Sequence, residues 1–165
     1  MQKKFFPIIL TIALLASSLV SYFYICSLQG NAKVINYAGV VRGATQRLVK
    51  QELNHRPDDP LIERIDGILS ELQTGEGDNG LIRLNSDAFQ GLIVQMQADW
   101  ANLKEEIYRV RAGGESDTLF ADSESFFALA DRTVAAAEQY SEKSVRSAAG
   151  SLLILNCAFI LLMIL

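Results

Sequence analysis

Hydrophobic residues gather at the two ends of this 165-residue chain. The segment 5–28 contains no charged residue, and Arg146 is the last charge before a second apolar stretch that runs to Leu165. About 20 apolar residues suffice to cross a bilayer as a helix. We therefore expect transmembrane helices at 5–28 and 147–165, with a separate domain at 29–146 between them.

The first span carries an orientation signal. Lys3 and Lys4 lie in the short segment 1–4, and basic flanks stay on the cytoplasmic side of a membrane. The sequence therefore predicts a cytoplasmic N-terminus and an extracytoplasmic central domain, anchored in a membrane. A cleaved signal peptide is the alternative, but the apolar stretch is longer than a usual signal core and ends in the bulky run Tyr22–Ile25, which favours an uncleaved anchor.

Between the spans, apolar residues recur three and four positions apart, which is typical of amphipathic helices. Helix-breaking residues gather at 55–60, 74–80 and 112–117 and divide the domain into four helices. No segment alternates apolar and polar residues with period two, as a strand would. Because short connections favour antiparallel neighbours, the pattern predicts an all-α fold, an up-down-up-down four-helix bundle flanked by two transmembrane helices.

Each predicted helix has one apolar face, and the third has heptad spacing, the sequence form of bundle packing. Asp59 is the expected N-cap of the second helix, with Pro60 at its first helical position. Trp100 lies on the heptad face and is expected in the core. The positions expected to be buried are Val34, Ala38, Val41, Thr45 and Leu48 on the first helix, Leu61, Ile65, Ile68, Leu69 and Leu72 on the second, Phe89, Ile93, Met96, Trp100, Leu103, Ile107 and Val110 on the third, and Phe120, Phe127, Ala130, Val134, Ala137 and Ser141 on the fourth.

Charge and composition exclude several classes of function. Without Lys3 and Lys4, the domain holds 13 basic residues against 19 acidic ones, a formal charge of −6, whereas a nucleic-acid-binding protein needs a basic face. Cys26 and Cys157 lie in the apolar spans, so no disulfide framework is expected outside them. His55 is the single histidine and has no clustered partner, so we predict no metal site, no cofactor and no catalytic residue.

One segment of the first helix carries a more specific pattern: Ile35-Asn36, Ala38-Gly39, Arg42 and Gln46-Arg47. It resembles the segment that opens the extracytoplasmic sensor domains of nitrate/nitrite receptors and of pilus-type (PilJ-like) methyl-accepting chemotaxis transducers. Such domains stand at the N-terminus of bacterial histidine kinases, chemoreceptors and diguanylate cyclases. The resemblance implies a homodimer that binds a small anion and passes a helix displacement through the membrane. Gly43 departs from the pattern, because the transducers usually have Met there.

By this likeness, Arg42 is the expected ligand contact. Thr45 and Gln46 are expected to join it, because these polar residues share its face of the helix with the small residues Ala38 and Gly39. Two guanidiniums near a two-fold axis repel each other, and an anion between them relieves the repulsion while accepting charge-assisted hydrogen bonds. The alternative for Arg42 is an ion pair with a carboxylate of a neighbouring helix. Arg47 lies about 140° around the helix from Arg42 and is expected to form such a structural pair.

Two functions follow as hypotheses. The first is the input module of a transmembrane signalling receptor, either truncated or sensor-only, since no output module and no basic flank follow the second span. The second is a membrane-tethered helical scaffold or adhesion protein with no small-molecule ligand. A sensor should gather Arg42, Thr45 and Gln46 at a dimer face, whereas a scaffold should leave Arg42 solvated or in an ion pair.

Overall fold

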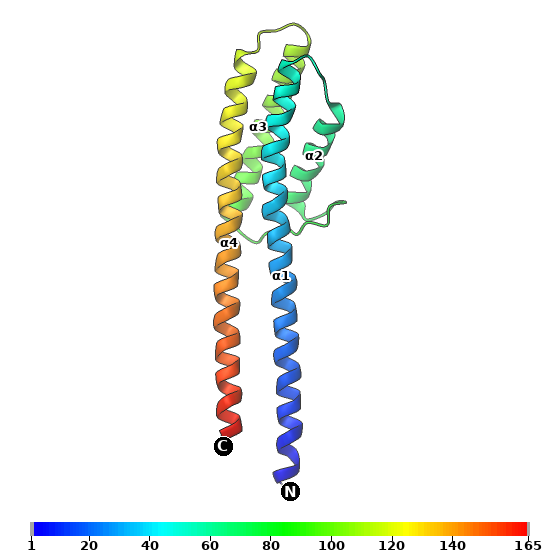
Figure 1. The fold of residues 1–165 in the computed structure, drawn as a ribbon. Helices are drawn as coiled ribbons and strands as arrows, with labels where there is room; N and C mark the ends of the chain where they lie inside the picture. Colours follow the sequence, from blue (N-terminus) through cyan, green and yellow to red (C-terminus); the bar gives the residue numbers. More distant parts are fainter. Residues whose placement is uncertain (1, 165) are drawn as a thin grey trace. The chain divides into compact units, whose positions relative to one another are not determined.

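The computed structural model describes residues 2–164, with side-chain surroundings for residues 7–161 and 163. This part of the chain forms four helices and no strand, which confirms the all-α prediction. The helices are α1 (Gln2–Leu53), α2 (Asp59–Thr74), α3 (Asp87–Arg111) and α4 (Asp117–Ile164) (Figure 1). The side chains of Lys3 and Lys4, on which the predicted orientation depends, and the last residue of the predicted second span, Leu165, lie outside the described residues.

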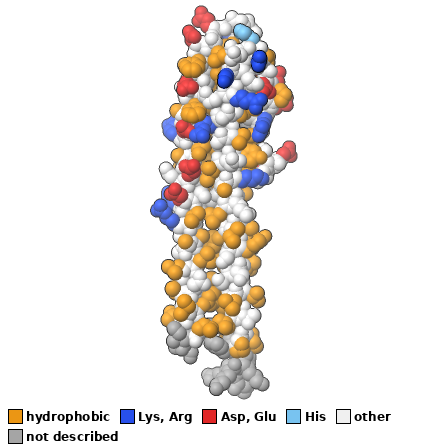
Figure 2. Space-filling model, in the orientation of Figure 1, with side chains coloured by type: hydrophobic (Ala, Val, Ile, Leu, Met, Phe, Trp, Pro, Cys, Tyr) orange, Lys and Arg blue, Asp and Glu red, His pale blue; other side chains and the backbone are white. Residues whose placement is uncertain are grey.

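The chain divides into two compact units. The core unit is Asn31–Tyr140, which lies within the predicted domain 29–146. The apolar unit consists of Met1–Gly30 and Ser141–Leu165. On the face drawn in Figure 2, hydrophobic side chains cover the apolar unit, while most charged side chains lie on the core unit.

Two helices, α1 and α4, are long and apolar enough to cross a membrane. Their most apolar 18-residue windows have mean hydropathies of 2.1 and 1.6, and only 0% and 6% of those windows is buried inside the protein. A core helix of a soluble protein would bury such residues against its neighbours. Leu15 and Ile154 instead remain 66% and 72% exposed. The apolar stretches of both helices are therefore suited to a lipid environment.

The core unit contains one hydrophobic core to which all four helices contribute. The predicted faces of the first and second helices are buried as expected, and so is the heptad face of α3 from Phe89 to Ile107. Trp100 is 2% exposed and its ring centroid lies 6.1 Å from that of Phe126 on α4. The prediction that Trp100 belongs to the core is confirmed.

The predicted apolar face of the fourth helix is wrong by one position at its N-terminal end. Phe120 is 58% exposed, and Phe127, Val134 and Ser141 are only partly buried. The true face was hard to recognise because it contains the polar residues Ser123 and Thr133, which are buried. Burial is tolerated because the Ser123 hydroxyl donates to Phe120 O at 2.7 Å and the Thr133 hydroxyl donates to Leu129 O at 2.9 Å, both within the helix. The buried face, spaced by four and three residues, is Leu119, Ser123, Phe126, Ala130, Thr133 and Ala137.

The N-cap of α2 is Asp58, not the predicted Asp59. Asp58 Oδ1 accepts a hydrogen bond from Leu61 N at 3.1 Å, and Asp59 is the first helical residue. A capping carboxylate has to lie outside the helical turn to reach the free N–H groups. The first of the two adjacent aspartates therefore caps the helix, and the side chain of Asp59 makes a different contact, which is described below.

A buried carboxylate organises the connection between α2 and α3. Glu71 is 1% exposed and accepts hydrogen bonds from Leu81 N at 2.7 Å, Asn79 N at 3.0 Å and Asn79 Nδ2 at 2.7 Å. A Cβ at Gly77 would lie 2.7 Å from the Glu71 carboxylate, so a larger residue there would displace the carboxylate from this position. The connection thereby inserts Leu81 and Leu84 into the core.

Glu71 should make stability depend on pH. Burial raises the pKa of Glu71, but the hydrogen bonds from Leu81 and Asn79 and the charge of Lys33 together hold it below its ordinary value of 4.5. A carboxyl group with a lowered pKa stabilises the folded state above its unfolded-state pKa and loses that contribution as the pH falls through the folded-state pKa. We expect urea unfolding of the full chain in detergent, followed by Trp100 fluorescence, to show this loss below about pH 4.5.

The variant Glu71→Gln should be less stable at neutral pH and should lose less stability on acidification. Glu63→Gln, which alters an exposed glutamate of the same helix, is the matched control and should behave as the unmodified chain. Equal pH dependence in the unmodified chain and in Glu71→Gln would show that the carboxylate does not stabilise the connection.

Candidate functional site

Arg42 of α1 is held by two side chains of α4. Its Nη1 forms an ion pair with Asp131 Oδ1, and its guanidinium carbon lies 5.5 Å from the centroid of the Phe127 ring. The side chains of Arg42 and Asp131 are 38% and 47% exposed. Exposed ion pairs of this kind contribute about 0.2–1 kcal/mol. A dissolved anion can therefore reach Arg42 and compete with Asp131 for it.

The other two predicted ligand contacts do not share an open surface with Arg42. Thr45 is fully buried, and its Oγ1 donates to Val41 O at 2.9 Å, which satisfies the hydroxyl within its own helix. It faces the core, where a ligand cannot reach it. Gln46 Nε2 instead donates to Ser123 O of α4 at 3.1 Å. The predicted cluster of three is therefore not formed, because helical spacing places Thr45 on the core side.

Arg42 and Gln46 nevertheless share a role in the structure. They lie four residues apart, one turn of helix, and both contact α4. α1 and α4 are also the two helices that continue without a break into the apolar unit. The pair of Arg42 and Asp131 therefore joins the two membrane-length helices.

Arg47, predicted to form a structural pair, makes only a long contact. Its Nη2 lies 4.0 Å from Asp58 Oδ2, and its side chain is 68% exposed. The other oxygen of Asp58 caps α2. At this distance and exposure the pair contributes little to stability. Arg47 thus remains largely available to solvent.

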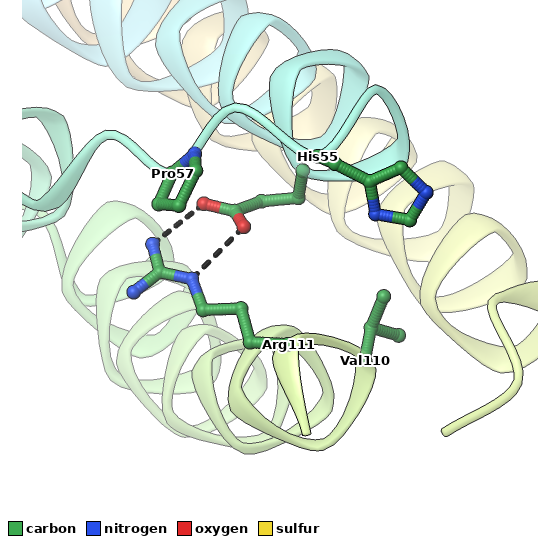
Figure 3. Close-up of a pocket in the computed structure, with 5 residues that line it drawn as sticks. His55, Pro57, Val110 and Arg111 are labelled. Atoms are coloured by element: carbon green, nitrogen blue, oxygen red, sulfur yellow. Dashed lines mark hydrogen bonds and ion pairs between the residues drawn. The ribbon is translucent and has the colours of Figure 1, made fainter. Parts of the chain in front are cut away.

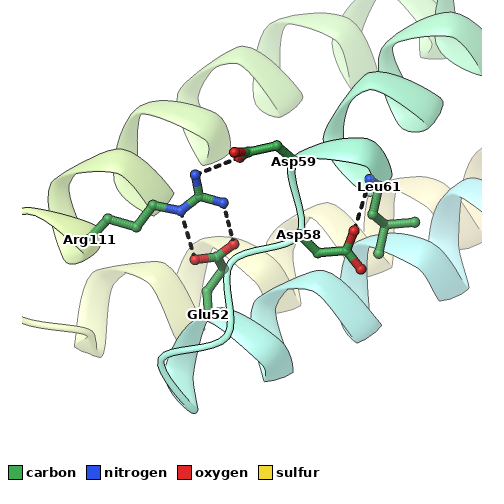
Figure 4. A network of polar contacts seen from close by, with 5 residues as sticks. All are labelled: Glu52, Asp58, Asp59, Leu61 and Arg111. Atoms are coloured by element: carbon green, nitrogen blue, oxygen red, sulfur yellow. Dashed lines mark hydrogen bonds and ion pairs between the residues drawn. The ribbon is translucent and has the colours of Figure 1, made fainter.

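A second polar cluster, which sequence reasoning missed, joins the end of α1, the start of α2 and the end of α3 (Figure 4). Arg111 Nε and Nη2 donate to the two oxygens of Glu52 at 2.9 and 2.6 Å, and Nη1 donates to Asp59 Oδ1 at 2.6 Å. The Glu52 side chain is 1% exposed. Its hydrogen bonds raise the pKa of Arg111 above the ordinary value, so the guanidinium stays charged. We call these three residues the Glu52 clamp.

The sequence did contain a signal for half of this clamp. Glu52 continues the buried spacing of α1 beyond Thr45 and Leu48, so a carboxylate stands at a core position. A buried charge requires a partner. The pattern gave no means of choosing Arg111, which lies 59 residues away, from the other basic residues.

A small pocket of about 190 Å³ lies beside the clamp and is lined by Glu52, His55, Pro57, Val110 and Arg111. Figure 3 shows His55 and Pro57, on the turn after α1, across from Val110 and Arg111 of α3. His55 is exposed and has a positive φ of 55°. The two charges in the pocket wall neutralise each other, so the pocket offers an ion no net attraction.

No group of three or more His, Cys, Asp or Glu side chains in the described part of the chain could hold a metal ion. Neither the models of known protein families nor the curated proteins compared with the chain match it. The functional argument therefore depends on the geometry around Arg42. An ion pair there agrees with the scaffold hypothesis, and the polar cluster of the sensor hypothesis stays a prediction about a dimer face.

Proposed function

We propose that this protein is the ligand-sensing input module of a bacterial transmembrane receptor, as its resemblance to the nitrate and pilus-type sensor domains implies. In this proposal, residues 29–146 lie outside the inner membrane, the chain forms a homodimer, and a small anion bound at Arg42 displaces the helices that cross the membrane. The observation that carries the proposal is that Arg42 and Asp131 join α1 to α4, the two helices that continue into apolar stretches.

Cross-helix contacts support the antiparallel, up-down-up-down order that this mechanism needs. Arg42 contacts Asp131 and Gln46 contacts Ser123, so the residue numbers of the partners on α4 fall as those on α1 rise. Arg111, at the end of α3, meets Asp59, at the start of α2. Both observations favour antiparallel neighbours, with the membrane-linked ends of α1 and α4 at the same end of the bundle.

The chemistry of the site suits a competition. An anion that accepts two or three charge-assisted hydrogen bonds from the guanidinium replaces a partly exposed pair with Asp131 at small cost. The ligand shifts the equilibrium between two helix arrangements only if it binds them with different affinity. Release of Asp131 provides that difference, because one arrangement keeps the link between α1 and α4 and the other loses it. Helix shifts of about 1–2 Å are typical of such transitions.

The glycines beside Arg42 favour the proposed homodimer. A Cβ added at Gly39 or Gly43 would meet no other atom within 4 Å, so this side of α1 is open. Glycines four residues apart let a second helix approach closely. A second copy of α1 packed there would bring its own Arg42 near the first, and an anion would relieve the repulsion between the two.

Three variants test this site in the full chain in detergent, by calorimetry with nitrate, nitrite and small carboxylates. Arg42→Ala should abolish binding, whereas Arg42→Lys should keep part of it because the charge survives without the bidentate geometry. Asp131→Asn should raise the affinity about 1.5- to 5-fold, since it removes a competitor worth about 0.2–1 kcal/mol. Arg64→Ala, which alters an exposed arginine of α2, is the control and should leave the affinity unchanged. Unchanged binding in Arg42→Ala would refute the site.

The second candidate is a membrane-tethered helical scaffold or adhesion protein. The ion pair of Arg42 and the burial of Thr45 favour it, because neither requires a ligand. It predicts that none of these anions binds the chain and that Asp131→Asn changes only stability, by less than about 1 kcal/mol. If none of the tested anions binds, the result would favour this candidate over the sensor.

A further inference from the structure

A cationic pocket lies at the end of α1, away from Arg42. It measures about 370 Å³ and is lined by Arg47, Lys50, Gln51, Asn54 and Arg56, none of which is acidic. Within the described residues, the side-chain nitrogens of Lys50 and Arg56 form no ion pair, and Arg47 has only its long contact with Asp58. Three cations thus stand together, without close partners, in a domain whose formal charge is −6.

An apolar pocket adjoins the cationic one. It measures about 190 Å³, and the two pockets have Lys50 and Asn54 in common. Its apolar wall is made by Val49 and Leu53 of α1 and by Phe120 of α4. Phe120 is the aromatic residue that the sequence predicted in the core and that is 58% exposed instead. An exposed aromatic side chain beside a shared lysine gives the composite site one apolar and one cationic half.

We propose that these two pockets together bind an organic anion with an apolar body, such as an aromatic or short aliphatic monocarboxylic acid. Its carboxylate lies among Lys50, Arg47 and Arg56, and its apolar body lies against Phe120 and Leu53. The site does not include Arg42, so it can be tested independently of the anion site of the proposed function.

Helix electrostatics account for only one of these residues. Cations near the C-terminus of a helix stabilise it by interacting with the helix dipole, which explains Lys50 in the last turn of α1. This effect does not reach Arg56, which lies beyond the helix, and it does not explain the exposed Phe120. The helix C-terminus places only about half a negative charge near an anion bound there, whereas Arg47, Lys50 and Arg56 carry three full positive charges.

Calorimetry on the full chain in lipid nanodiscs tests the proposal, with phenylacetate and hexanoate as probes and empty nanodiscs subtracted. Both probes should bind saturably, and succinate and inorganic phosphate, which lack an apolar body, at least tenfold more weakly. Arg56→Gln, Lys50→Gln and Phe120→Ala should each lower the affinity about tenfold. Arg132→Gln and Val94→Ala, which alter an exposed cation and an exposed apolar side chain elsewhere, should not change it.

Three results would overturn the proposal. The first is no saturable binding of either probe. The second is binding of phosphate or succinate as tight as that of phenylacetate, which would remove the apolar half of the site. The third is probe binding that is lost in Arg42→Ala but kept in Arg56→Gln, which would assign the probe to the other site. The altered side chains are exposed, and unchanged Trp100 fluorescence will show that each variant keeps the fold.

Discussion

Replacing Arg111 with alanine should lower the free energy of unfolding of the core unit by about 3–5 kcal/mol. The reason is that Glu52 would lose its partner. Glu52 has a side chain that is 1% exposed and receives two hydrogen bonds from Arg111. Without the guanidinium, a buried carboxylate remains without a compensating charge. Urea unfolding of the full chain in detergent, followed by Trp100 fluorescence, measures the loss.

Arg109→Ala is the matched control for this prediction. Arg109 lies two residues earlier on α3 and pairs with Glu106 at 2.6 Å, but its side chain is 41% exposed. Its loss should cost less than about 1 kcal/mol. The double variant Glu52→Leu with Arg111→Met should be far more stable than Arg111→Ala, because it removes both charges and fills the space with apolar groups. If Arg111→Ala costs no more than Arg109→Ala, the clamp does not stabilise the fold.

Local pattern was sufficient to predict most of the helices. The spacing of Val34, Ala38 and Val41 predicted the buried face of α1, because a helix repeats every 3.6 residues and places such positions on one side. The heptad on α3 was equally readable, since one large apolar residue occupies each position of its seam. The breakers at 55–60 and 112–117 marked the ends of helices because glycine and proline disfavour helical backbone.

The fourth helix shows where local pattern fails. Phe126 and Phe127 are adjacent, so two faces one position apart were both plausible from hydrophobicity alone. Packing against Trp100 decides between them, and that contact joins residues far apart in the chain. The buried Ser123 and Thr133 count as polar in any hydrophobic pattern, although each satisfies its hydroxyl within the helix.

The candidate site was harder to predict than the fold for the same reason. The helical spacing of Arg42 shows which side of α1 it occupies, but its partner Asp131 lies 89 residues away. The grouping of Arg42 with Thr45 came from their positions on the helix, while the core pattern already assigned Thr45 to the buried face. The cationic pocket brings Arg56 of the turn after α1 beside Lys50, and its apolar neighbour includes Phe120, which the sequence had placed in the core.

Replacing Trp100 with alanine should destabilise the core unit by about 3–5 kcal/mol, as expected for a large aromatic side chain removed from a packed core. Trp100 is 2% exposed, its ring lies beside that of Phe126, and its Nε1 donates to Asp66 at 2.7 Å. Because the variant has no tryptophan, circular dichroism during thermal unfolding replaces fluorescence as the measurement.

Two further variants separate the contributions to this effect. Trp100→Phe keeps most of the apolar volume and should cost only about 1–2 kcal/mol, mainly the lost hydrogen bond and a smaller ring. Asp66 is not left without a partner, since Lys104 Nζ also donates to it at 2.6 Å. Val94→Ala, on the exposed side of α3, should change stability by less than about 0.5 kcal/mol. If Trp100→Ala instead leaves stability almost unchanged while binding of the anions is lost, Trp100 lines a ligand site and the interpretation of the α3 seam as core is wrong.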